Sequence, residues 1–435
     1  REAAATTFDR NVVVIAGAGT GKTTLLVNRL LYLLMRRTDP LDLSRIVALT
    51  FTNKAAAEMK LRLRERLRSL VNAEGRDNPQ AGSGTVSIAD LRMRYGWTTD
   101  EIVARADAAL RDVEKAQIGT LHSFAAHLLR LYPIEAGVTP TFQTDEDGSR
   151  FEEHFTNEWE LWLDRELGAA GSDHGRWRIV LDTFSLDELR ELAYSLHSDL
   201  IDLNGLMQQV AATGLNKGLR DWFSLRKAQA ERLLARYDRP KRRKIELMLA
   251  AVAELFALLL AEGLGALRSF PRESQELLAK DLGAAPTGWE EDDYEAVESL
   301  QRIAKRLLRV DHELLQNLLA LLAPFVQSVR KSFLDSGWLT FDGLVGKART
   351  LLRDHPPIRE QVKRDYRALL VDEFQDTDPV QYEIVLYLAE RPGTQAGSWR
   401  ETELESGKLF IVGDPKQSIY AFRRADIEAF DHVVA

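Results

Sequence analysis

Short apolar runs, each followed by helical periodicity, occur near both ends of the chain. Residues 11–16 (NVVVIA) and 46–50 (IVALT) are apolar and rich in β-branched side chains, a pattern typical of buried strands. A weaker strand is predicted over 116–119, and two further apolar runs occupy 368–371 (ALLV) and 409–412 (LFIV). Strands that alternate with helices indicate a parallel sheet, because parallel neighbours need a crossover connection that a helix supplies.

The middle of the chain has a different pattern. From about 132 to 335, Leu, Ala, Glu and Arg recur at helical spacing, and strand signals are few. We therefore predict an α/β domain made of residues 1–131 and 336–435, interrupted by an all-helical domain over 132–335. The two outer pieces are expected to close one parallel sheet, with crossover helices on its faces.

Composition narrows the class of protein. The chain has 435 residues, of which 45% are hydrophobic and 29% charged, an ordinary globular mixture with room for two or three domains. It has no cysteine, which excludes disulfide scaffolds, thiolate zinc sites, iron–sulfur clusters and cysteine nucleophiles. The same absence fits a reducing compartment, so a cytoplasmic location is expected. The longest apolar stretches, 25–35 and 247–260, are shorter than the roughly 20 residues of a membrane span, and no membrane partner is expected.

The net charge of −8 does not exclude nucleic acid, because binding follows local patches of charge and not the total. The stretch 54–68 is strongly basic, and its only acidic residues are Glu58 and Glu65. Its basic residues are Lys54, Lys60, Arg62, Arg64, Arg66 and Arg68. The stretch is either a nucleic-acid contact or a solvated helix face. The basic run 239–244 (RPKRRK) leaves the same two alternatives, with the solvated face favoured.

The first strand runs into a loop of small residues. Residues 16–23 (AGAGTGKT) match the phosphate-loop pattern, with Ala16 where Gly is more usual. Small residues let backbone N–H groups surround phosphates, and the helix that follows adds its dipole. Lys22 is expected to reach the β- and γ-phosphates of ATP, and the Thr23 hydroxyl to ligate Mg²⁺. The alternative is a glycine-rich turn. The predicted nucleotide-binding residues are Gly17, Ala18, Gly19, Thr20, Gly21, Lys22, Thr23 and Thr24.

Two adjacent carboxylates follow the strand at 368–371. Phosphoryl transfer to water needs a carboxylate on the metal side and a group that orients the attacking water. Asp372 is the candidate for the Mg²⁺ shell, and Glu373 for the general base. The alternative is a solvated strand end. After the last strand, Gln417 stands where it could sense the γ-phosphate or its water, a weak signal by itself.

These residues carry a resemblance to a known family. Residues 372–377 (DEFQDT) and 413–426 (GDPKQSIYAFRRAD) resemble motifs II and III of the superfamily 1 DNA helicases of the UvrD/RecB type. Residues 50–59 (TFTNKAAAEM) resemble their motif Ia, and 118–124 (IGTLHSF) resemble the next DNA-contacting motif. Residues 339–344 (LTFDGL) resemble the segment ahead of motif II. Five ordered motifs make the match specific, although they leave the helical middle uncovered.

The resemblance implies further roles. The exact sequence of motif III, and Thr24 where UvrD-like monomers usually have Arg, favour the RecB/AddA branch. Gln417 would couple the nucleotide state to DNA, and Arg423 would contact the γ-phosphate. For the aromatic residues and the histidine among the implied DNA contacts, core packing is the alternative. The residues implied to line a single DNA strand are Thr52, Asn53, Lys54, His122, Ser123, Phe124, Tyr420 and Phe422.

The resemblance also implies what the chain lacks. The family has two RecA-like domains with ATP between them, and the second carries an arginine finger that nothing after Asp426 supplies. We therefore expect a RecA-like first motor domain from a larger protein, with a second motor domain and possibly a nuclease or partner subunit. The isolated chain should hydrolyse ATP weakly, because such a finger contributes about 10³–10⁵ in turnover.

The expected function is that of an ATP-dependent DNA helicase or translocase that uses ATP and Mg²⁺ and acts on single-stranded or duplex DNA. The family implies 3′→5′ polarity and a role in DNA break processing and repair. One alternative is an ATP-binding structural or regulatory subunit of a helicase–nuclease complex, without motor activity. Another is a different phosphate-loop enzyme, such as a nucleotide kinase, for which no acceptor site is recognised.

Overall fold

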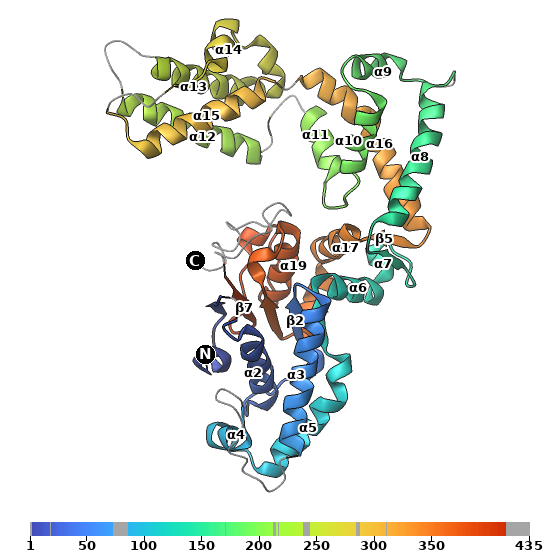
Figure 1. Cartoon of the computed structure of the whole chain (residues 1–435), viewed down its shortest axis with the longest axis vertical. Coiled ribbons are helices and arrows are strands. Elements are labelled where there is room, and N and C mark those ends of the chain that lie inside the picture. Colours follow the sequence, from blue (N-terminus) through green and yellow to red (C-terminus); the bar gives the residue numbers. More distant parts are fainter. Residues whose placement is uncertain are drawn as a thin grey trace. The chain divides into compact units, whose positions relative to one another are not determined.

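The computed structural model describes residues 2–17, 19–72, 86–169, 171–211, 215, 217–237, 244–283, 288–309 and 311–414 (Figure 1). These residues form two compact units. The first comprises the described residues of Arg1–Phe151 and Phe333–Ala435, and the second those of Glu152–Ser332. None of the described helices combines the length and apolar character that a membrane crossing requires.

A five-stranded parallel sheet forms the centre of the first unit, in the order β1-β7-β6-β2-β3. Two strands from the C-terminal part of the sequence, β7 and β6, lie between β1 and the pair of β2 and β3, so neither end can form the sheet by itself. The strands are β1 (Val12–Ile15), β2 (Ile46–Thr50), β3 (Gln117–Thr120), β6 (Ala368–Asp372) and β7 (Leu409–Gly413). The weak strand signal near 116–119 thus corresponds to β3, at one edge of the sheet.

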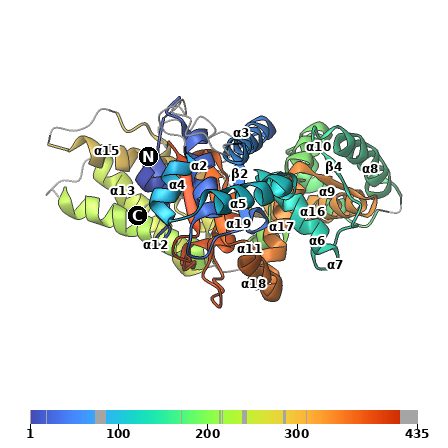
Figure 2. The ribbon, with the colours of Figure 1, turned by 90° about the horizontal axis from the view of Figure 1, so that it is seen from below.

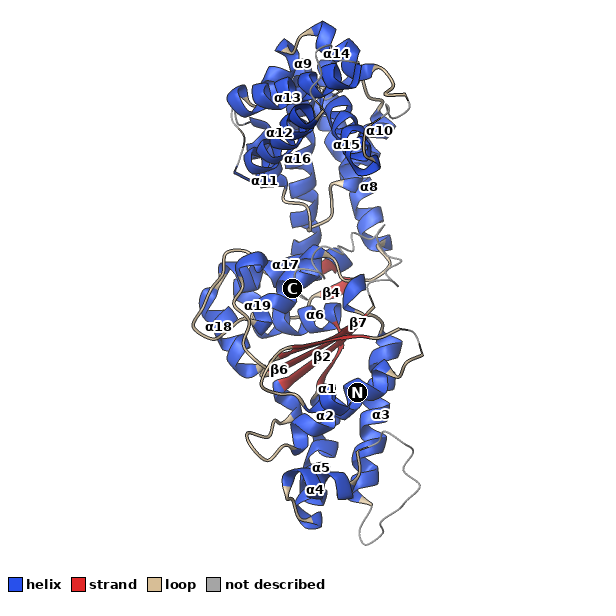
Figure 3. Cartoon of the chain, turned by 90° about the vertical axis from the view of Figure 1, so that its left-hand side faces the viewer, coloured by secondary structure: helices blue, strands red, loops and turns tan. Residues whose placement is uncertain are grey.

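Helices cover both faces of this sheet (Figure 3). Side chains alternate along each strand, so Ala368 and Leu370 of β6 pack on one face while Leu369 and Val371 pack on the other. The layer over the first face consists of α1 (Glu2–Thr6), α2 (Lys22–Met35), α3 (Asn53–Val71), α4 (Ile88–Tyr95) and α5 (Thr99–Asp112), with the short helices η1 (Leu43–Arg45) and η2 (Val113–Lys115). The opposite layer consists of α6 (Leu121–Leu131), α7 (Pro133–Ala136), α17 (Phe341–Asp354), α18 (Pro356–Asp365) and α19 (Pro379–Ala389).

A second, two-stranded sheet lies where the chain leaves and re-enters the first unit. It pairs β4 (Gln143–Asp145) with β5 (Trp338–Thr340) in parallel. Phe142, just before β4, belongs to the same core as the central sheet. The packing therefore divides the chain after Phe151 and before Phe333, and not after residue 131 and before residue 336 as the periodicity suggested.

The second unit consists of helices in the part that the structure describes. In both views α12, α13 and α15 lie side by side (Figures 1 and 2), and they share a core that includes Phe256 and Leu300. A second group of buried aromatic rings joins Phe155, Trp162 and Phe325. The helices that lie in this unit wholly or in part are α8 (Ser149–Leu167), α9 (His174–Leu181), α10 (Leu186–Ser195), α11 (Leu203–Ala211), α12 (Lys217–Arg236), α13 (Lys244–Glu262), η3 (Leu264–Ser269), α14 (Arg272–Ala279), α15 (Glu291–Leu307) and α16 (His312–Asp335).

A buried ionic cluster holds the segment between α19 and β7 against α18. Glu390 is completely buried and accepts an ion pair from Arg359 (2.6 Å) and another from Lys363 (3.2 Å). Its second carboxylate oxygen accepts a hydrogen bond from the Ala396 backbone N–H (2.7 Å). Charges removed from water need this degree of pairing, because desolvation costs several kcal/mol per ion.

The ionic cluster leads to a stability prediction. The Glu390→Gln variant should lose about 3–5 kcal/mol of unfolding free energy, because two buried cations would lose their shared counter-charge. Glu403→Gln is the matched control, since Glu403 forms an exposed ion pair with Arg391 (3.2 Å) and such pairs contribute little. Urea denaturation of both variants measures the difference. Equal midpoints for the two variants would contradict a stabilising role for the buried cluster.

Candidate active site

Loops from both ends of the sequence meet where the strands of the central sheet end. We call this line of carboxyl ends the carboxyl edge of the sheet, and the site described below lies along it. The strands β1, β7 and β6 are neighbours, with Ile15 opposite Gly413 and Val412 opposite Asp372. Because all the strands are parallel, the loops that follow them leave at the same edge. The phosphate loop follows β1 and is joined to β7 by a hydrogen bond from the Ala16 N–H to the Gly413 carbonyl (3.0 Å). The candidate catalytic segments are therefore adjacent.

The phosphate loop has the backbone geometry of an anion site. Gly19 and Gly21 have φ angles of 71° and 80°, a left-handed conformation that glycine adopts without steric cost. The Thr20 hydroxyl donates to the Gly17 carbonyl (2.7 Å), which closes the turn. Gly21 precedes α2 and has no side chain to cap it, so the first N–H groups of this helix can serve an anion.

Lys22 and Glu373 form an ion pair at this edge. The Lys22 Nζ lies 2.5 Å from a carboxylate oxygen of Glu373, and the Lys22 side chain is 10% exposed. Apart from this ion pair, the ammonium has no hydrogen bond of good geometry among the described residues. Glu373 has a φ of 52°, an uncommon conformation for a residue with a side chain, and it turns the chain sharply after β6.

Asp372 lies at the end of β6 and shares this environment. Burial and the neighbouring charge of Glu373 raise the pKa of Asp372 to about 6, while the charge of Lys22 opposes the shift. Two carboxylates beside one ammonium leave an excess of negative charge that a cation would neutralise. Among the described residues, no group of three or more His, Asp or Glu side chains could hold a metal ion alone. The residues fit Mg²⁺ that arrives with phosphates, since Mg²⁺ is commonly held by one or two carboxylates plus substrate oxygens.

Gln375 and Asp376 complete the site, and motif reasoning gave them no role. The Gln375 side-chain amide donates to Glu373 (2.8 Å) and to Asp376 (3.3 Å), and its carbonyl accepts from the Asp414 backbone N–H (2.9 Å). Gln375 is buried and thus connects the loop after β6 to the loop after β7. Burial, followed by the charge of Glu373, raises the pKa of Asp376. In the sequence, the run of polar residues DEFQD after the strand was the feature that could have pointed to both residues.

The other end of the same sheet edge carries the motif Ia segment. Thr50 of β2 pairs with Thr120 of β3, so α3 and α6 both begin at the edge that carries the phosphate loop. The Thr52 hydroxyl caps α3 by accepting from the Ala55 N–H (3.1 Å). Thr52, Asn53 and Lys54 are exposed there.

Two exposed aromatic residues lie in the motif segments and were not singled out by sequence reasoning. Phe341, the first residue of α17, is 42% exposed and stacks on His122 with a ring separation of 3.5 Å and an interplanar angle of 16°. Phe51, at the end of β2, is 37% exposed. Burial lowers the pKa of His122 to about 4, against a smaller opposite effect of Asp342, so the ring is neutral near pH 7.

Comparison with known proteins agrees with this geometry. Residues 1–434 match the family model described as the UvrD/REP helicase N-terminal domain. The chain belongs to this family. The resemblance seen in the motifs is therefore confirmed.

Relatives of this UvrD/REP helicase domain include subunits of helicase–nucleases. An ATP-dependent helicase/nuclease subunit of Bacillus mycoides (strain KBAB4) is 26% identical, over 96% of this chain and 34% of the relative. The RecBCD enzyme subunit RecB of Escherichia coli (strain K12) is also 26% identical, over 95% of this chain and 35% of the relative. The chain thus spans about a third of the length of these relatives.

In the UvrD/REP helicase domain, two of the predicted DNA contacts interact with residues of the domain itself. Phe124 is 2% exposed and packs edge-on against Tyr366, with ring centroids 5.3 Å apart. Core packing, the alternative raised for it, is thus what the structure describes, and Phe124 is not part of an accessible surface. Ser123 is exposed, but its hydroxyl donates to the Thr120 carbonyl at the start of α6 (2.7 Å).

Several predictions fall on residues outside the described part of the chain. These residues are Ala18 of the phosphate loop, Gln417, Tyr420, Phe422 and Arg423 of the motif III segment, and most of the basic run 239–244. The basic stretch on α3 is described, and part of its charge is compensated. Arg62 pairs with Glu58 (2.5 Å), and Arg64 pairs with Glu114.

The lowered pKa of His122 leads to a pH prediction. This pKa is lower in the folded chain than its ordinary value of 6.5, so the unfolded chain binds an extra proton between pH 6.5 and about 4. Stability should therefore fall as the pH decreases through this window, by about 3–4 kcal/mol in total at roughly 1.4 kcal/mol per unit. His122→Phe keeps an aromatic stack on Phe341 but cannot titrate. Its denaturation midpoint should depend less on pH, and parallel curves for the two proteins would contradict the burial effect.

Proposed function

We propose that this chain is the first motor domain of an ATP-dependent DNA helicase or translocase that acts, with further domains, in DNA break processing and repair. The observation that supports this most directly is the Lys22–Glu373 ion pair beside Asp372. These three groups, a phosphate-binding cation, a general base and a metal-side carboxylate, are what phosphoryl transfer to water requires.

The ion pair suggests how nucleotide binding prepares the site. In the structure the Lys22 ammonium neutralises Glu373. Phosphates bound in the loop after β1 would draw Lys22 toward themselves, because they carry more negative charge than one carboxylate. Glu373 would then lose its counter-charge and be able to accept a proton from the attacking water. Gln375, hydrogen-bonded to Glu373, would hold the carboxylate in position.

Mg²⁺ would enter with ATP and be held by the Thr23 hydroxyl and Asp372. When bound, it supplies positive charge that stabilises the phosphates during transfer. The electrostatics supports this assignment, since burial and then the charge of Glu373 raise the pKa of Asp372, and a bound cation would favour the charged carboxylate.

The DNA strand is proposed to run over the carboxyl ends of β2 and β3, beside the proposed nucleotide site. Asn53 and Lys54 are exposed at the start of α3 and can contact phosphates, while Phe51 and Phe341 offer exposed rings for bases. Stacking on aromatic side chains tolerates any sequence, as a translocating motor requires. In this proposal Phe341 replaces Phe124, whose ring is buried.

A second motor domain is part of the proposal. Helicase–nuclease subunits to which the chain is similar are about three times as long as the chain. An arginine finger from a second RecA-like domain, and 3′→5′ movement, are proposed by analogy with the family. On this basis the longer polypeptide, and not the isolated chain, should show full turnover.

The leading test is ATP hydrolysis by the longest native polypeptide containing this chain, with and without single-stranded DNA. DNA should stimulate turnover, and Glu373→Gln should reduce it by about 10²–10⁴ because the base is lost. Binding of ATP and DNA, measured separately, should persist in this variant.

Lys22→Ala is the companion variant, because it should lose nucleotide affinity as well as turnover. Normal hydrolysis in Lys22→Ala would refute the assignment of the phosphate loop. ATP binding without DNA-stimulated hydrolysis in the wild-type protein would favour the structural or regulatory subunit instead.

Phe341→Ala tests the DNA surface. Loss of one stacking ring should weaken single-strand affinity by about 1–3 kcal/mol, or five- to 150-fold, measured by fluorescence anisotropy at fixed salt. Met93→Ala is the control, since Met93 is 84% exposed on α4, on the layer opposite α17. Affinity should also fall as salt rises, through release of counterions. An unchanged affinity in Phe341→Ala would remove this residue from the DNA path.

A further inference from the structure

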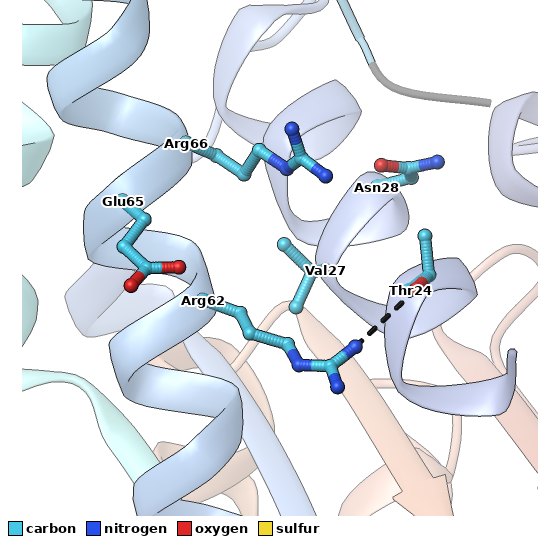
Figure 4. Close-up of a pocket in the computed structure, with 6 residues that line it drawn as sticks. All are labelled: Thr24, Val27, Asn28, Arg62, Glu65 and Arg66. Carbon is cyan, nitrogen blue, oxygen red and sulfur yellow. Dashed lines mark hydrogen bonds between the residues drawn. The ribbon is translucent and has the colours of Figure 1, made fainter. Parts of the chain in front are cut away.

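A pocket of about 310 Å³ lies between α2 and α3, one residue beyond the phosphate loop (Figure 4). Each helix contributes three residues at the spacing i, i+3 and i+4, which places them on one face. The lining residues are Thr24, Val27 and Asn28 of α2, and Arg62, Glu65 and Arg66 of α3. Thr24 is one of the predicted nucleotide-binding residues, and the function proposed above gives no role to the other five.

Hydrogen-bond donors dominate the walls of this pocket. Arg62 and Arg66 extend from α3 toward α2, while the carboxylate of Glu65 lies over its own helix (Figure 4). An arginine side chain has five N–H donors and no acceptor, and the Asn28 amide and Thr24 hydroxyl can also donate. Such a set suits a ligand that only accepts hydrogen bonds, and paired guanidinium groups match the oxygens of phosphate best.

The two arginines differ in whether they already have interaction partners in the structure. Arg62 pairs with Glu58 (2.5 Å) and approaches the Thr24 hydroxyl (3.4 Å). Arg66 is half-buried, yet within the described part of the chain it has neither a hydrogen bond nor an ion pair. A partly desolvated cation without a counter-charge is costly, and a bound anion would relieve that cost.

We propose that this pocket binds a phosphate group, separately from the phosphates held by the loop before α2. Val27, which is buried, provides an apolar wall that strengthens the electrostatic attraction by lowering the local dielectric. Arg66 provides the free charge, and Arg62, Asn28 and Thr24 provide further donors. The inference does not rest on the proposed motor activity, because the pocket stands on its own lining residues.

Two sources could deliver this phosphate, and position favours one of them. Arg62 and Arg66 lie roughly 14–20 Å along the α3 axis from Asn53, at 1.5 Å per residue, and thus well away from the proposed DNA contacts. Thr24, by contrast, directly follows Thr23. Free phosphate near the nucleotide site is therefore favoured over a phosphate of the DNA backbone. A phosphate in the pocket would link α2, which follows the phosphate loop, to α3, which begins with the motif Ia segment.

The test is binding of inorganic phosphate to the full chain with the nucleotide site saturated by Mg²⁺–ADP. Isothermal titration calorimetry should show one saturable phosphate site, and Arg66→Gln should weaken it about tenfold or more, because a charge-assisted contact is lost. Arg68→Gln is the matched control, since Arg68 is exposed on the same helix and does not line the pocket. Arg66→Lys, which keeps the charge but loses the bidentate geometry, should fall between them.

Three results would overturn the proposal: no saturable phosphate binding, binding abolished by Mg²⁺–ADP, or equal affinities in Arg66→Gln and Arg68→Gln. The second would assign the phosphate to the loop before α2. A single-stranded oligonucleotide then identifies the source. If the oligonucleotide displaces phosphate from the wild-type chain, the ligand is a backbone phosphate. If phosphate stays bound, the ligand is free phosphate, and either result leaves the pocket assigned.

Discussion

The parallel order of five strands is the constraint on which the rest of the structure depends. Along the carboxyl edge of the sheet, the C-terminal ends of β1, β7 and β6 are followed by those of β2 and β3. The first three carry the phosphate loop and the carboxylates, and the last two lead into the helices with the motif Ia and next-motif segments. Since β6 and β2 are direct neighbours, the loop after β6 and the segment that leads into α3 leave the sheet side by side. The proposed nucleotide site and the proposed DNA path are therefore adjacent because of the strand order.

Negative charge exceeds positive charge among the described side chains at this edge, which favours binding of a cation. In the part of the chain that the structure describes, Asp372, Glu373 and Asp376 lie near one ammonium, that of Lys22, and burial and the charge of Glu373 raise the pKa values of Asp372 and Asp376. Adding the phosphates of a nucleotide would increase the excess of negative charge. A divalent cation would offset this repulsion, which is why the proposed function has ATP and Mg²⁺ bind together.

Much of this arrangement could be predicted from the sequence, because the informative features are local. A β-branched run followed by small residues specifies a strand and a phosphate loop, and Asp372-Glu373 follows its strand directly. What could not be predicted depends on contacts between distant segments. The stack of Phe341 on His122, and the bridge from Gln375 to Asp414, join segments that only the folded sheet brings together. Phe124 was misplaced because a motif gives residue identity but not which face of α6 meets the core.

The same helical period accounts for both the core and the pocket on α3. Met59, Leu63 and Leu67 recur at spacings of four and are buried against the sheet side of the domain. Arg62 and Arg66 each precede one of these leucines and so lie on the adjoining stripe, next to α2. Packing α3 against the sheet therefore forces two guanidinium groups toward the helix that follows the phosphate loop. A basic stretch that looks uniform in the sequence thus gives its arginines different surroundings: Arg64 is paired with Glu114, Arg68 is exposed, and Arg62 and Arg66 line the pocket proposed to bind phosphate.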